Sequence, residues 1–171
     1  MIIMKRVFIV SFVLLAAIAT TAYGVGVRAN FSPSEASVQQ MTADEMFHKA
    51  QCFMLGQEGH PQHNGKAAEW FYQAAEKGHV EAQNVIASLL ADGIGVVKDE
   101  AEAIKWFTIA ANNGHARAQS RLGTIYSRGL LGVTKSDVEA EKWYRMADKN
   151  GDLVARKWLL KKENEKKEQE K

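Results

Sequence analysis

The sequence predicts an all-α protein, a solenoid of helix pairs with three repeats plus a C-terminal capping helix. Three aromatic pairs recur at intervals of 36 and 37 residues: Trp70-Phe71, Trp106-Phe107 and Trp143-Tyr144. Around each pair, apolar residues return at the three- and four-residue spacing of an amphipathic helix, and no strand pattern follows residue 43. Because sequence periods of about 20–50 residues indicate solenoids, we expect helix pairs stacked one on the next.

A glycine beyond each aromatic pair keeps the same intervals, at Gly78, Gly114 and Gly151. The second interval is one residue longer because the loop at 93–96 becomes 129–133, with one added leucine. The repeat domain is therefore expected at residues 43–160, with units at about 43–78, 79–114 and 115–151 and a partial unit at 152–160.

The first 29 residues have the pattern of an export signal. Lys5 and Arg6 precede an uncharged run at residues 7–27, and small residues follow its most apolar part. This order is typical of a secretory signal peptide, and a polar linker at residues 30–42 follows it. The candidate cleavage points lie after Ala22, Gly24 or Ala29. The alternative is an uncleaved membrane anchor, since 21 uncharged residues could just span a bilayer. Either interpretation predicts a periplasmic, secreted or membrane-anchored protein whose repeats lie outside the cytoplasm.

Capping signals give the helix boundaries. Thr42 with Glu45, and Ser136 with Glu139, have the spacing of a capping box, and Asp99 is a third N-cap candidate. The repeated glycines suit helix ends, because they adopt the left-handed conformation without a Cβ clash. We expect helices near 43–55, 66–77, 80–91, 99–112, 116–128, 137–149 and 152–168.

The second helix of each unit has one apolar face, which in the middle unit consists of Ala103, Trp106, Phe107 and Ala110. The regular spacing of the tryptophans favours core packing over a carbohydrate-binding platform. Trp106 is therefore expected to be largely buried between the helices of its unit.

The last expected helix begins like a fourth repeat, with Ala155 and Leu159, and continues into a charged run from Lys161 to Lys167. A charged outer face allows a solenoid to end without exposing a stacking surface. Residues 161–171 are therefore expected to form a solvated, charged helix or tail. A charged tail that binds a partner is the alternative.

The third unit carries a specific series of motif residues: Leu122, Gly123, Tyr126, Gly129, Gly132, Val133, Trp143, Tyr144 and Gly151. With the matching second unit, it resembles the Sel-one-like repeat (SLR) family, relatives of the tetratricopeptide repeat. The resemblance covers about residues 43–160 and is weakest at 57–61, where the first unit lacks the Gly-x-Gly-Val loop. It implies a right-handed superhelical solenoid of antiparallel helix pairs that serves as a scaffold for protein partners in an exported bacterial protein.

Enzymatic activity is not expected. Some exported relatives bridge each helix pair with two cysteines, and activity against β-lactams has been attributed to some of them. Cys52 is the only cysteine here, so this activity is not carried over. Ser-x-x-Lys, Gly-x-Ser-x-Gly and His-Glu-x-x-His are all absent, which disfavours an envelope hydrolase. We expect no catalytic residue and no cofactor.

The charge of the chain disfavours a nucleic-acid partner. The chain is 46% apolar and 25% charged, with a formal net charge of +2. Without the first 29 residues the net charge is −1, whereas neutralising phosphates needs a basic surface. The expected partner is a protein or peptide, with no membrane contact beyond the N-terminal segment.

A metal-binding or redox-sensing envelope module is the alternative function. His48 and Cys52 lie four residues apart on one helix, on the side expected to face away from the core. His60 and His63 follow in the next loop. Imidazole and thiolate groups bind zinc or copper, but no closed ligand motif is present, so no metal is assigned.

The binding groove is expected on the first helix of each pair, which lines the concave face in tetratricopeptide solenoids. The side opposite the core residues supplies the candidate groove residues, which are Asn84, Ser88, Ser120, Arg121, Thr124, Arg128, Lys157 and Lys161. The basic residues lie toward the C-terminal end. An acidic segment or a C-terminal carboxylate of the partner would suit them, because arginine pairs bidentately with carboxylates.

Overall fold

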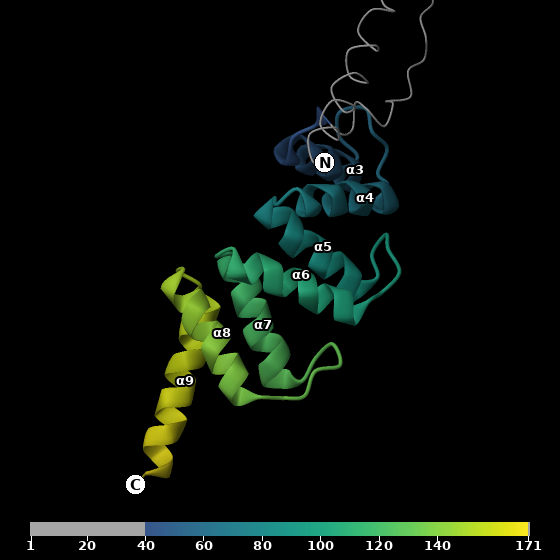
Figure 1. Ribbon diagram of the computed structural model, residues 1–171. Helices are drawn as coiled ribbons and strands as arrows, with labels where there is room; N and C mark the ends of the chain where they lie inside the picture. Colours follow the sequence, from purple (N-terminus) through teal and green to yellow (C-terminus); the bar gives the residue numbers. More distant parts are fainter. Residues whose placement is uncertain (1–39, 171) are drawn as a thin grey trace, which may run out of the picture. The chain divides into compact units, whose positions relative to one another are not determined.

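The computed structural model describes residues 40–170, which contain seven helices and no strand (Figure 1). In chain order they are α3 (Ala43–Leu55), α4 (Asn64–Glu76), α5 (Val80–Asp92), α6 (Glu100–Asn112), α7 (Ala116–Arg128), α8 (Asp137–Lys149) and α9 (Leu153–Gln169). The segment 1–29, interpreted as a signal peptide or anchor, lies outside the described residues. Within the described part of the chain, no helix combines the length and apolarity needed to cross a membrane.

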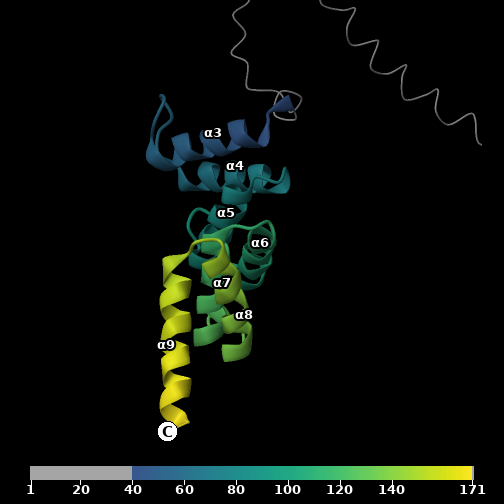
Figure 2. The same cartoon turned by 90° about the vertical axis from the view of Figure 1, so that its left-hand side faces the viewer.

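Each helix packs on the next one in the chain, and α9 also touches α7 (Figures 1 and 2). The pairs α3–α4, α5–α6 and α7–α8 therefore stack in sequence order, and α9 follows the third pair. This arrangement confirms the predicted all-α repeat solenoid with a C-terminal helix.

Local capping explains why the helices begin where they do. Thr42 and Glu45 form the predicted capping box of α3, and the Asp99 side chain accepts from the Glu102 N–H at the start of α6. Every observed boundary lies within two residues of its predicted position. The largest difference is at α4, which begins at Asn64 because Nδ1 of His63 accepts the Lys66 N–H. Histidine is not among the usual N-cap residues, so the sequence pattern did not indicate this start.

Imidazole caps also start α5 and α7. Nδ1 of His79 accepts the Ala82 N–H at 3.0 Å, and Nδ1 of His115 accepts the Ala118 N–H at 3.1 Å. Nε2 of His115 lies 2.8 Å from a carboxylate oxygen of Glu81, on the first helix of the preceding unit. These histidines therefore have a structural role at the turns between units.

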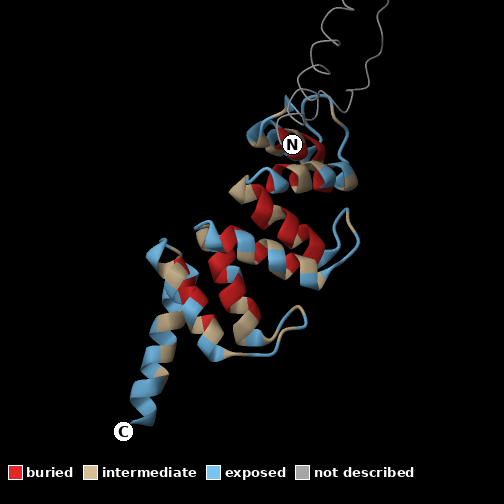
Figure 3. Cartoon of the chain, viewed as in Figure 1, coloured by how far each residue is buried: buried red, intermediate tan, exposed pale blue. Residues whose placement is uncertain are grey.

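The core lies between the two helices of each unit and between neighbouring units (Figure 3). Phe71, Phe107 and Tyr144 are almost fully buried in it. The α7–α8 contact is close because residue 123 is glycine: a Cβ there would lie 2.7 Å from the Tyr144 ring.

Trp106 is only partly exposed, in line with the prediction that it is largely buried, but it packs on the preceding unit and not only between the helices of its own unit. Trp106 is half-buried, as is Trp70, whereas Trp143 is buried. The Trp106 indole lies edge-on to the ring of Tyr72 on α4, with 5.5 Å between centroids, and its N–H donates to Glu102. It therefore covers the edge of the contact between α4 and α6, and Phe107 beside it occupies the core.

Helix α9 packs on the third unit through Ala155, Trp158 and Leu159, which contact the cluster around Tyr144. Lys162 also donates to Asp137 of α8 at 3.0 Å. At the repeat position of Gly123, α9 has Leu160, which is 55% exposed. On α7, the small Gly123 leaves room for the Tyr144 ring of α8. Leu160 would fill that space on α9, so α9 does not offer a further helix the same packing surface.

Candidate protein-binding groove

A hollow of about 390 Å³ lies between the first helices of the three units. Its apolar lining comes from Met54 of α3, Val85 and Leu89 of α5, and Phe107 of α6. Its polar lining comes from Glu81, Asn84 and Ser88 of α5 and from Arg117 and Arg121 of α7. We call this cavity the α3–α5–α7 hollow. Side chains of all three units meet in it, so stacking of the units is what creates the site.

Three of the predicted groove residues, Asn84, Ser88 and Arg121, line the α3–α5–α7 hollow. Arg128, Lys157 and Lys161 are exposed elsewhere, and Lys161 lies 3.8 Å from Glu165 in an ion pair. The structure therefore brings together three residues from the N-terminal half of the predicted set and none from its C-terminal end.

The expectation that all these residues face away from the core is wrong for Asn84 and Ser120, which are only 6% and 7% exposed. A first helix is covered on two sides by its own second helix and by the preceding unit, so only a narrow strip reaches solvent. Thr124 is half-buried, and its hydroxyl group shares a hydrogen bond of 3.0 Å with that of Tyr144. Ser120 and Thr124 do not line the hollow.

Arg117 is the residue of the hollow that the sequence analysis missed. It lies four residues before Arg121, so the two side chains share one face of α7. That spacing was a usable signal. Met54 and Phe107 carried no comparable signal, because their sequence pattern is that of core residues. They line the hollow only because the units stack.

The hollow contains polar groups without a partner among residues 40–170. The side-chain amide of Asn84 makes no hydrogen bond there, and neither Arg117 nor Arg121 forms an ion pair. The carboxylate of Glu81, by contrast, is engaged with His115. An amide and two guanidinium groups therefore remain available beside an apolar lining.

Comparison with known proteins fits this repeat architecture. The Sel1 repeat model matches residues 46–79, 80–115 and 116–152. The chain belongs to the Sel1 repeat family. The predicted Sel-one-like identity is thereby confirmed. Sel1 repeats generally mediate protein–protein interactions, and the family is a scaffold family that is generally non-enzymatic.

Two solved Sel1-type structures are similar to this chain. One is a protective antigen present in uropathogenic Escherichia coli strains, which displays an SLR fold; it is 33% identical with a TM-score of 0.66. That match covers 72% of this chain and 26% of the antigen, so this chain spans about a quarter of its length. The other is a Sel1 repeat protein from Oxalobacter formigenes, 34% identical with a TM-score of 0.64, covering 70% of this chain and 88% of that protein. No curated protein matches the sequence.

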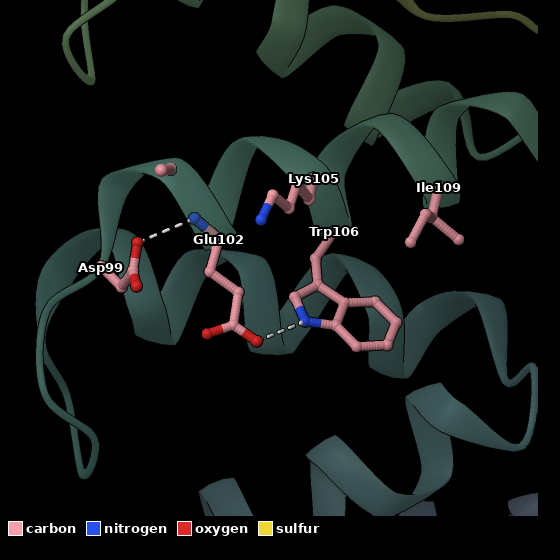
Figure 4. Close-up of a pocket in the computed structure, with 6 residues that line it drawn as sticks. Asp99, Glu102, Lys105, Trp106 and Ile109 are labelled. Atoms are coloured by element: carbon pink, nitrogen blue, oxygen red, sulfur yellow. Dashed lines mark hydrogen bonds between the residues drawn. The ribbon is translucent and has the colours of Figure 1, made fainter.

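A second, smaller hollow of about 270 Å³ lies on α6, a second helix of the Sel1 array (Figure 4). Asp99, Glu102, Lys105, Trp106 and Ile109 line it. One oxygen of Glu102 accepts from both the Trp106 indole at 3.4 Å and the Tyr72 hydroxyl at 3.3 Å. Burial and the Glu102 carboxylate raise the pKa of Tyr72. Because its main polar groups already bond to one another, this surface has less to offer a ligand.

The predicted metal candidates of the first Sel1 unit separate in the structure. His63 caps α4, and the His60 ring packs on Phe53 with 4.5 Å between centroids. His48 and Cys52 do lie together, but Cys52 is only 3% exposed, so the expectation that it faces away from the core is wrong. The turn after α3 covers it, because the Gln57 N–H donates to the Cys52 carbonyl and Glu58 follows. Burial and the hydrogen bond to Glu58 raise the pKa of the Cys52 thiol.

Proposed function

We propose that this protein is a non-enzymatic scaffold whose α3–α5–α7 hollow binds an extended acidic segment of a protein partner. The observation that carries the proposal is the pair of guanidinium groups, Arg117 and Arg121, beside the unbonded amide of Asn84 in one hollow. Stacked helix pairs build extended binding surfaces of this kind.

The chemistry of the hollow favours a peptide with carboxylates. Arginine binds carboxylates through two parallel hydrogen bonds, so two arginines one helical turn apart suit an acidic side chain or a chain terminus. The Asn84 amide can donate to and accept from a peptide backbone. The Met54 and Leu89 side chains provide apolar contact for a neighbouring residue of the segment.

The proposal includes a location outside the cytoplasm, either periplasmic or secreted. Its support is the sequence of residues 1–29, with Lys5 and Arg6 before an uncharged run. Expression of the full chain, followed by cell fractionation and N-terminal sequencing, tests this. The mature protein should lack about 22–29 residues. A cytosolic protein of full length would contradict the proposed location but would not bear on the scaffold function.

The binding function is tested with fluorescent peptides of equal length whose net charge ranges from acidic to basic. The acidic peptides should bind best, as measured by fluorescence anisotropy. The double variant Arg117→Glu/Arg121→Glu should weaken this binding by more than about tenfold, since each hydrogen bond to a charged group contributes about 1.5–3 kcal/mol.

Lys105→Glu/Lys142→Glu is the matched control. It changes the net charge equally, but both lysines are exposed on second helices, outside the α3–α5–α7 hollow. It should leave affinity within about twofold, because distant exposed charges are screened by salt. Equal losses in both double variants would mean that net charge, and not the hollow, attracts the peptide.

A further inference from the structure

We propose that His48, Cys52 and Glu58 form a binding site for a divalent transition-metal ion, for which Zn²⁺ is the best match. One ligand atom from each residue can be chosen so that all lie within 4.8 Å of one another. The site is distinct from the α3–α5–α7 hollow, so it stands or falls independently of the proposed function.

The three side chains come from one helix and the turn that follows it. His48 and Cys52 are four residues apart on α3, so both point to the same side of the helix. The chain then reverses at Gly56, and Glu58 adopts a left-handed conformation with φ of 53°. This turn brings the Glu58 carboxylate back to α3, with one oxygen near the imidazole and the other near the thiol.

With one ligand atom taken from each residue, the three atoms lie within 4.8 Å of one another, somewhat wider than in a zinc site; the shorter pairwise contacts use both ring nitrogens of His48 and both oxygens of Glu58. Cys52 Sγ lies 3.4 Å from Oε2 of Glu58 and 3.8 Å from Nδ1 of His48. Nε2 of His48 lies 3.6 Å from Oε1 of Glu58. Around a tetrahedral zinc ion, with bonds of about 2.0–2.3 Å, two ligand atoms are about 3.5 Å apart. Side-chain rotations that bring the three ligand atoms from within 4.8 Å to about 3.5 Å of one another would therefore let one ion replace the present contacts.

The ligand types select the class of metal. A thiolate and an imidazole are soft or borderline ligands, which suit zinc, and they disfavour calcium and magnesium, which take oxygen ligands. As the sulfur–metal bond forms, the Cys52 thiol releases its proton to solvent. Three protein ligands leave a fourth position for water.

The surroundings admit and attract a cation. The cluster opens into a hollow of about 520 Å³, which Cys52 lines together with both of its partners. Asp44, Glu45 and Lys49 also line it, so together with Glu58 the hollow has three acidic residues against one lysine. A zinc ion would bring the positive charge that this set of groups lacks.

Zinc titration of the full chain, purified without a polyhistidine tag, tests the site by calorimetry. One equivalent should bind. Glu58→Gln should lower the affinity by more than about tenfold, since even an outer-shell partner of a metal site typically contributes that much. Glu58 is exposed, so this variant should keep its melting temperature without metal. His60 lines the same hollow but lies outside the cluster, so the control variant His60→Gln should bind zinc with the affinity of the natural chain.

Cobalt provides a second readout that is specific for the thiol. Co²⁺ bound to the natural chain should show a thiolate-to-metal charge-transfer band, and Cys52→Ser should abolish it. Absence of stoichiometric zinc binding by the natural chain would overturn the proposal. So would unchanged affinity in Glu58→Gln, or a cobalt complex without the thiolate band.

Discussion

Asn150, at the C-terminal end of α8, donates a hydrogen bond of 2.9 Å to the side-chain oxygen of Gln119 on α7. The amide nitrogen of Gln119 in turn donates to the Ala111 carbonyl at the end of α6, at 2.8 Å. One buried glutamine therefore joins the end of one unit to both helices of the next. Asn113, Gln83 and Ala75 repeat the arrangement one unit earlier.

Gln119→Met should destabilise the protein by about 1–3 kcal/mol, because it removes two hydrogen bonds of about 0.5–1.5 kcal/mol each, while the Ala111 carbonyl keeps the Gly114 N–H and the Asn150 amide keeps the Gly114 carbonyl. Urea unfolding measures the change. Gln83→Met should cost a similar amount, since its contacts are equivalent. A fully stable Gln119→Met variant would show that the hydrogen bonds of Gln119 do not help to hold the units together.

Gly123→Ala should also destabilise the protein, although alanine is the better helix former by about 1 kcal/mol. The added Cβ would lie 2.7 Å from the Tyr144 ring, which is fixed between Thr124 and Trp158. Overpacking of this kind typically costs about 1–3 kcal/mol, so the clash should outweigh the helix preference. A higher melting temperature for the variant would contradict the packing described.

Phe107→Ala should cost about 3–5 kcal/mol, the usual range for a fully buried aromatic residue. Trp106→Ala should cost less, because Trp106 is half-buried and Phe107 is 1% exposed. Comparing the two free energies of unfolding tests which aromatic residue of each pair fills the core. A larger loss from Trp106→Ala would restore the interpretation that the tryptophans form the core.

The stability of α8 and of its contact with α9 should depend on pH. The hydrogen bond from Lys162 lowers the pKa of Asp137, and the hydrogen bonds from Arg145 and, more weakly, Lys166 lower the pKa of Glu141. With a folded pKa below the unfolded value, each carboxylate stabilises the fold above about pH 4.5 and loses this contribution as pH falls through the folded pKa.

Asp137→Asn/Glu141→Gln should accordingly melt below the natural chain at neutral pH, and the gap should narrow as the pH falls below the ordinary carboxyl pKa values. Melting both proteins across this range measures it. A gap that persists at the lowest pH would mean that these carboxylates act through packing and not through charge.

The sequence predicted most of the helix boundaries, because capping depends on a few neighbouring residues. Thr42 with Glu45, and Asp99, specify their helix starts locally. The depth of Trp106 could not be predicted in the same way, since it depends on Tyr72 from the preceding unit, 34 residues away.

The candidate sites were predicted only in part for a similar reason. Asn84 lines the hollow as predicted, but it is buried and not turned away from the core, and its burial depends on packing against the neighbouring helices. Glu58 was not a candidate ligand, because only the left-handed turn after Gly56 brings it to Cys52. The glutamate carried no signal in a loop without a repeat motif.

The most direct test of binding in the α3–α5–α7 hollow is a nuclear magnetic resonance titration of the ¹⁵N-labelled protein with the best-binding acidic peptide. Two side-chain N–H groups report on the two candidate surfaces: the Asn84 amide lies in the α3–α5–α7 hollow, and the Trp106 indole lies in the hollow on α6. The account predicts that the Asn84 signals shift with the peptide and the Trp106 signal does not. A shift of the Trp106 indole with the Asn84 amide unchanged would contradict it.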